Sequence, residues 1–157
     1  QDVYAVMGGA VEGDIFSNAL FENTSKSNDN SWITLELQGT TANTSAIGAR
    51  IKIVVTQMDG QTRKIMRTIG TGGSFGAGSL QAEIGLGKAK EIKLISIGWP
   101  NAQQTTETYR NLGINKFYRI VEGKQPKVLK REPVAFRKMD EMENGNNNVY
   151  SLKPQRF

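Results

Sequence analysis

Hydrophobic and polar side chains alternate along several short segments of this chain. Strict alternation is typical of a β-strand that buries one face and exposes the other. In residues 32–37 and 50–56, every second side chain is apolar and is expected to be buried: Ile33, Leu35, Leu37, Ile51, Ile53 and Val55. Each of these segments therefore predicts a strand packed on a core.

Further strands are predicted for residues 62–69, 91–99, 116–121 and 127–130. Asp59-Gly60 favours a tight type I′ hairpin turn before the first of them, because these residues tolerate positive φ. The segment 91–99 is apolar in part on both faces, which indicates a central strand. No window of eleven residues has a helical period, and residues 102–111 hold a short helix at most. The prediction is an all-β fold, an antiparallel β-sandwich of jelly-roll or immunoglobulin-like type with little or no helix.

Three glycine-containing segments look like joints of such a fold: Asn43 to Ile53, Ile84-Gly85-Leu86-Gly87 and Ile97-Gly98-Trp99-Pro100. Gly48 is expected to let a strand bend, and Pro100 to end a strand, because proline donates no ladder hydrogen bond. The glycine-rich segment 70–78 does not fit a dinucleotide or Walker loop, since neither the glycine spacing nor a following Gly-Lys-Ser/Thr is present. It is interpreted as a β connection.

The composition argues against catalysis. The 157 residues include no cysteine and no histidine, which excludes thiolate and imidazole ligands and the usual general base. The acidic residues Asp2, Glu12, Asp14, Glu36 and Glu107 show no spacing typical of a catalytic pair. We therefore expect no enzyme activity and no catalytic, cofactor-binding or metal site.

The formal net charge of +5 is unevenly distributed. Residues 1–122 carry 12 Lys and Arg against 11 Asp and Glu, whereas residues 123–157 carry 8 against 4. The positive excess is thus expected in the C-terminal tail rather than across a folded face, and no nucleic-acid partner is predicted. The longest apolar runs are far shorter than the ~20 residues of a membrane-spanning helix, so direct membrane insertion is not expected.

Aromatic residues are the remaining candidates for ligand binding. Five of them are candidates for a sugar-stacking platform: Trp32, Phe75, Trp99, Tyr109 and Tyr118. The alternative is that Trp32 and Trp99 cap the core from strand ends, which is the more frequent role of such residues. The ligand candidates taken forward are Trp99, Asn101, Tyr109 and Phe75.

The order and spacing of the motifs resemble the ASPIC/UnbV domain, which follows FG-GAP/VCBS propeller repeats in exported proteins and in cartilage acidic protein. The matching segments are Asn30-Ser31-Trp32-Ile33, Leu37-Gln38-Gly39, Asn43 with Ala46-Ile47-Gly48-Ala49-Arg50, Gly72-Gly73-Ser74-Phe75, Ile84-Gly85-Leu86-Gly87 and Ile97-Gly98-Trp99-Pro100. Asn101-Ala102 departs from the usual Ser-Gly, so that turn is expected to differ.

The resemblance implies a domain division and a setting. Residues 1–29 resemble the end of a propeller repeat with a linker, residues 30–122 are the ASPIC/UnbV-like domain, and residues 123–157 are an extension partly packed on the sandwich. The expected partners are preceding propeller repeats and a glycan or surface protein, at an extracellular, cell-surface or periplasmic location. Two functions stay open: a non-catalytic adhesion or glycan-binding module, and an accessory domain of a polysaccharide-processing enzyme whose catalytic part lies outside this chain.

Overall fold

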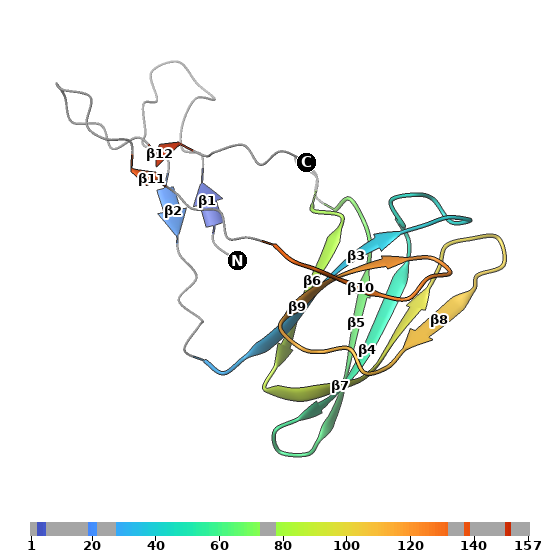
Figure 1. Ribbon diagram of the computed structural model, residues 1–157, viewed down its shortest axis with the longest axis horizontal. Helices are drawn as coiled ribbons and strands as arrows, with labels where there is room; N and C mark the ends of the chain where they lie inside the picture. Colours follow the sequence, from blue (N-terminus) through green and yellow to red (C-terminus); the bar gives the residue numbers. More distant parts are fainter. Residues whose placement is uncertain are drawn as a thin grey trace.

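Two four-stranded sheets pack face to face in the computed structural model, which describes residues 3–5, 19–21, 28–72, 78–131, 137–138 and 150–151 (Figure 1). One sheet has the order β10-β9-β3-β6, formed by Lys127–Leu129, Lys116–Val121, Ser31–Gln38 and Gln81–Gly87. The other has the order β5-β4-β7-β8, formed by Thr62–Thr68, Arg50–Gln57, Ala89–Gly98 and Thr106–Tyr109. Two further hairpins are β1 (Val3–Ala5) with β2 (Ala19–Phe21) and β11 (Arg137–Lys138) with β12 (Tyr150–Ser151).

This architecture confirms the predicted all-β sandwich. All described strand pairs are antiparallel except β3 and β9, which run parallel in register from Ile33 opposite Lys116 to Gln38 opposite Val121. The six alternating apolar residues of β3 and β4 are buried, as predicted: Ile33, Leu35, Leu37, Ile51, Ile53 and Val55. They form one core with the inward side chains of the other strands. No helix occurs in the described residues.

A bulge explains why β7 is apolar on both faces. Val54 of β4 pairs with Leu94 and Val55 pairs with Ile92, so Lys93 is an extra residue in β7. An extra residue reverses the alternation of a strand at that point. Ile92 on one side of the bulge and Ile95 on the other therefore both face the core. The strand is central, between β4 and β8, as the sequence indicated.

The segment Ile84-Gly85-Leu86-Gly87 forms the end of β6, and only Lys88 separates it from β7, so it is one of the joints that the sequence suggested. Ser31 pairs with Gly87 while Trp32 pairs with Gly85, so Leu86 is the extra residue of a second bulge. Gly87 has a φ of 62°, which a glycine adopts without strain. The glycines therefore allow the bulge, and the chain turns into β7 only at Lys88.

One local prediction was wrong, and one strand was not predicted. The turn after β4 holds three residues, Met58 to Gly60, and only Gly60 has positive φ there. It is consequently a type I turn with a glycine bulge rather than a type I′ turn. The short helix allowed for residues 102–111 does not form, because Thr106–Tyr109 pairs with β7 as strand β8. The predicted edge strand after residue 126 is present as β10.

Candidate functional site

The carboxylate of Glu122, directly after β9, lies buried at the end of the sandwich and organises the loop that follows β3. Its Oε2 atom accepts hydrogen bonds from three successive backbone N–H groups, those of Thr40, Thr41 and Ala42, at 2.7–2.9 Å. Its Oε1 atom accepts from the Thr41 hydroxyl and from Asn101 Nδ2, both at 2.6 Å. We call these five residues the Glu122 network.

The local chain geometry makes this arrangement possible. Gly39 begins the loop after β3, and a Cβ atom there would lie 2.3 Å from Asn43 O, so no other residue fits. The Glu122 backbone N–H donates to Gln38 O at 2.8 Å, which fixes the carboxylate beside the loop. Successive N–H groups that converge on one point form a concave anion site. In this chain the anion is the protein's own glutamate.

Hydrogen bonding decides the charge of Glu122. Burial by itself raises the pKa of its carboxyl, but the hydrogen bonds from residues 40–42 and from Asn101 outweigh burial and hold the pKa well below its usual range. Glu122 is therefore ionised at neutral pH. Both of its oxygens are already occupied by donors within the chain, which leaves this carboxylate unsuited to general acid–base chemistry.

A second carboxylate, Glu107 of β8, joins β7, β8 and the end of β9. Its Oε2 atom accepts from Trp99 Nε1 at 2.9 Å and from the Tyr109 hydroxyl. Its Oε1 atom accepts from the Gly123 N–H at 2.7 Å. These four residues form the Glu107 network. Burial raises the pKa of the Tyr109 hydroxyl, and the bond to the Glu107 carboxylate raises it further.

Three of the four ligand candidates lie inside these two networks. Trp99, Tyr109 and Asn101 are 2%, 8% and 9% exposed, so none presents a ring face or a free amide to solvent. This burial favours the alternative interpretation, in which Trp99 caps the core. Phe75 lies outside the described residues. A ligand-binding role for these four residues stays a prediction.

Sequence reasoning missed Glu122, and it considered Glu107 only as a member of a catalytic pair. The available signal for Glu122 was its position directly after a strand whose inward residues are Tyr118 and Ile120. A charged residue that continues a buried pattern needs internal partners.

The Asn101 side chain also closes its own turn, by accepting from Thr105 N at 3.0 Å and donating to Thr105 Oγ1 at 2.7 Å.

Comparison with known families identifies the chain. A sequence model described as ASPIC and UnbV matches residues 39–127, which is more than half of the chain. The chain belongs to this family. No curated protein and no solved structure matches it.

Within this ASPIC and UnbV domain, the family motifs contact one another. Gly48, at a φ of 93°, lies where a Cβ atom would be 3.4 Å from the Cβ of Pro100. Asn43 closes the loop before it, since its Oδ1 accepts from Ile47 N at 2.8 Å and its Nδ2 donates to Ile47 O at 2.9 Å. The motif segments around Asn43 and Trp99-Pro100 are therefore joined in space, and they hold the end of the sandwich where the Glu122 network lies.

A different set of polar and aromatic side chains lies on the outer face of β3 and β9. Trp32 is 37% exposed and packs edge to face on Phe117, with ring centroids 4.9 Å apart. The guanidinium of Arg131 lies 5.0 Å from the centroid of the Phe117 ring. We call Trp32, Glu36, Gln81, Phe117, Arg119 and Arg131 the Trp32 surface.

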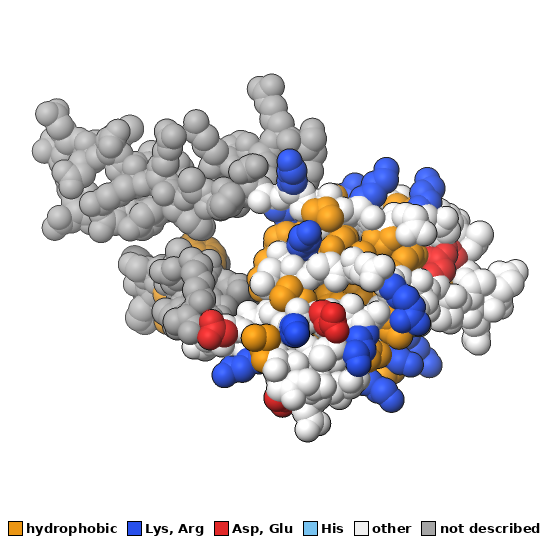
Figure 2. Space-filling view, turned by 60° about the horizontal axis from the view of Figure 1, so that its bottom comes forward, with side chains coloured by type: hydrophobic (Ala, Val, Ile, Leu, Met, Phe, Trp, Pro, Cys, Tyr) orange, Lys and Arg blue, Asp and Glu red, His pale blue; other side chains and the backbone are white. Residues whose placement is uncertain are grey.

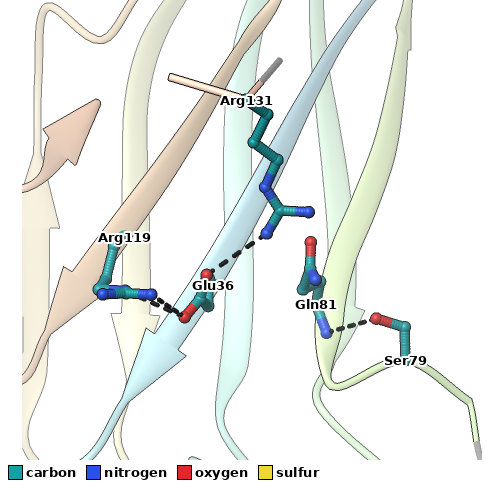
Figure 3. Close-up of polar contacts among 5 residues, drawn as sticks. All are labelled: Glu36, Ser79, Gln81, Arg119 and Arg131. Carbon is teal, nitrogen blue, oxygen red and sulfur yellow. Dashed lines mark hydrogen bonds and ion pairs between the residues drawn. The ribbon is translucent and has the colours of Figure 1, made fainter. Parts of the chain in front are cut away.

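Figure 3 shows the polar half of the Trp32 surface. Glu36 pairs with Arg119 at 2.8 Å and with Arg131 at 3.5 Å, and all three side chains are partly exposed. Gln81 lies opposite Glu36 on β6, and its Oε1 atom is buried without a hydrogen-bond donor among the described residues. The arrangement offers two guanidinium groups, a carboxylate and an amide beside an exposed aromatic ring.

Other kinds of site find little support in the part of the chain that the structure describes. No group of three or more Asp, Glu, His or Cys residues there could hold a metal ion. No helix in that part of the chain is long and apolar enough to cross a membrane. The Trp32 surface, with its exposed ring and paired charged groups, is the candidate binding site of this ASPIC and UnbV domain.

Proposed function

We propose that this domain is a non-catalytic glycan-binding module of a larger secreted or surface protein, with the Trp32 surface as its binding site. The observation that supports this proposal is the exposed ring of Trp32 packed on Phe117, whose ring Arg131 also contacts while it pairs with Glu36. Sugars combine an apolar C–H face with hydroxyl groups. An aromatic ring packs on the first, and arginine, carboxylate and amide groups hydrogen-bond the second.

The polar groups of this surface are held in place before a ligand arrives. Arg131 is positioned by the Phe117 ring and by Glu36, and Arg119 by Glu36 through its Nε at 3.0 Å. Ordering of side chains in advance reduces the entropy lost on binding.

The wider setting in this proposal follows from the family. The chain resembles the module that follows FG-GAP/VCBS repeats. The partners that we propose are therefore preceding propeller repeats and a surface glycan. The proposed location is extracellular, cell-surface or periplasmic. Adhesion is then the consequence of glycan binding by the module.

A glycan array on the purified chain tests the proposal directly. We expect at least one neutral or charged oligosaccharide to bind, and Trp32→Ala to lower its affinity by about tenfold or more, because an aromatic anchor often carries this much binding energy. Met58→Ala is the matched control, since Met58 is exposed in the β4–β5 turn away from this surface. The proposal is overturned if no glycan binds, or if both variants bind like the wild type.

A further inference from the structure

The outer face of the second sheet, opposite the Trp32 surface, gathers four basic side chains. Arg50 and Lys52 of β4 and Lys64 of β5 share this face, because Lys52 pairs with Met66 and Val54 pairs with Lys64. Lys93, the extra residue in the β7 bulge, reaches the same face, since its Nζ lies 3.1 Å from Thr62 Oγ1 of β5. We call these four residues the basic face.

This positive charge is hardly compensated. All four side chains are exposed, and no ion pair joins them to a carboxylate within the described residues. Glu91 is the one carboxylate among the described strand residues of this face, and it accepts a hydrogen bond from Thr56 at 2.9 Å. Figure 2 shows a similar balance on the face it presents, where Lys and Arg side chains are common and Asp and Glu are few.

The basic face corrects an expectation from the sequence. The positive excess of the chain was expected in the tail and not across a folded face. Residues 1–29 contain five acidic residues and one basic residue. The count over residues 1–122 therefore understated the positive charge of residues 30–122. Residues 30–122 alone carry 11 Lys and Arg against 6 Asp and Glu, and Glu107 and Glu122 are among those six.

The side chains between the cations have the character of a polysaccharide site. Val54 is 9% exposed at the centre of the face, with Met66 at 61% beside it, so a small apolar area lies among the lysine stems. Rows of hydroxyl groups flank it, from the exposed Thr68, Thr106 and Thr108 and the half-buried Ser96. Sugar rings bring apolar faces and hydroxyls, and acidic sugars add carboxylate or sulfate charges.

The aromatic content of the basic face argues against a nucleic-acid ligand. Single-stranded nucleic acids bind where bases stack on aromatic rings between basic groups. The ladder positions of this face hold no Phe, Tyr or Trp among the described residues. Non-specific binding of duplex DNA needs only basic groups along the phosphates, so duplex DNA is one of the ligands compared in the test.

We propose that the basic face binds an acidic polysaccharide laid across β4 and β5. Arg50, Lys52, Lys64 and Lys93 neutralise the charges of the polymer, and the flanking hydroxyl groups hydrogen-bond its sugar hydroxyls. This site is independent of the Trp32 surface, which lies on the other sheet. It gives the module a second, charge-driven attachment to a matrix of acidic sugars.

The test compares two triple variants of the full chain with equal loss of charge. Arg50→Gln with Lys52→Gln and Lys64→Gln alters the basic face. Lys116→Gln with Lys124→Gln and Lys127→Gln removes the same charge from exposed residues on and beside the other sheet. Binding to polygalacturonate, to heparin, to neutral dextran and to duplex DNA is measured by titration calorimetry at low and high salt.

We expect an acidic polysaccharide to bind more tightly than dextran and DNA, with an affinity that falls as salt rises. The first triple variant should lose at least tenfold in affinity, and the second should stay within about threefold of the wild type. Equal losses in both variants would show a response to net charge alone and overturn the proposal, as would stronger binding of DNA or no binding of either acidic polymer. Loss on Trp32→Ala with retention in the first triple variant would overturn the basic face while supporting the Trp32 surface.

Discussion

Glu36 lies in β3 and Glu122 lies directly after the neighbouring strand β9, but their environments are opposite. Glu36 lies on the outer face of β3 and is shared between two exposed arginines. Glu122 follows β9, is buried, and is surrounded by neutral donors from one loop and one asparagine. The same sheet therefore exposes one carboxylate on its outer face, whereas the other is buried where its strand β9 ends.

The difference shows how a negative charge is stabilised without a cation. Exposed ion pairs are screened by water and salt, and they contribute little to the free energy of folding. Buried N–H and hydroxyl donors already point at Glu122, so removing the carboxylate leaves each of these donors without its acceptor. The buried glutamate is thus tied to the fold, whereas the exposed one can change with small effect on stability.

The largest expected effect comes from Glu122→Ala. This substitution leaves the N–H groups of residues 40–42 without an acceptor and removes one of the acceptors of the Asn101 amide, and we expect a loss of about 3 kcal/mol or more in the free energy of unfolding. Urea denaturation followed by tryptophan fluorescence measures it. Glu83→Ala, which removes an exposed carboxylate from β6, is the control and should stay within about 0.5 kcal/mol. A loss below 1 kcal/mol for Glu122→Ala would contradict the importance of the network.

Acid should act through the same residue. The folded pKa of Glu122 is lowered, so its contribution to stability is fully present above the unfolded pKa of about 4.3 and is lost as pH falls toward the folded value. Stability should decline from about pH 5 downward in the wild type. The Glu122→Gln variant cannot lose this contribution, so its curve should be flatter over that range. Parallel curves for the two proteins, measured by thermal unfolding, would rule this explanation out.

Glu107→Gln should have an intermediate effect. The glutamine keeps one oxygen for Trp99 and Tyr109 or for Gly123 but not for both sides, and Glu107 is only half-buried. We expect a loss of about 1–2 kcal/mol, close to that of one or two hydrogen bonds. The pKa of Tyr109 should also fall toward 10, because one of the groups that raise it loses its charge. An ultraviolet pH titration follows this change, and an unaltered tyrosine titration would argue against the network.

Sequence patterns predicted the strands well where one rule determined the structure. Alternation located the buried residues of β3 and β4, since one face of each strand packs on the core. Prediction failed at Leu86 and Lys93, because a bulge depends on the register of the partner strand and leaves no local mark. The sequence did not predict a strand at residues 106–109, because this strand is defined only by its pairing with β7.

The site was less predictable than the fold. Trp99, Asn101 and Tyr109 were chosen by residue type, and the structure shows that their polar groups face two glutamates. Tyr109 bonds Glu107 two positions away in β8, whereas Trp99 bonds Glu107 over 8 positions and Asn101 bonds Glu122 over 21 positions. Contacts over such separations depend on the sheet order, which no local pattern contains. Phe117 and Arg131 were likewise not singled out. Their ring and guanidinium come together only through the antiparallel pairing of β10 with β9.

The smallest effect is expected for Glu36→Gln. Its two ion pairs are partly exposed, so the free energy of unfolding should change by less than about 1 kcal/mol, and this difference should shrink as salt is added. Denaturation with Glu83→Gln as control measures both. A loss as large as that of Glu107→Gln would remove the contrast between the buried and the exposed carboxylates. If stability is retained while glycan affinity changes, the exposed carboxylate acts in binding, because its loss frees Arg119 and Arg131 without disturbing the fold that positions them.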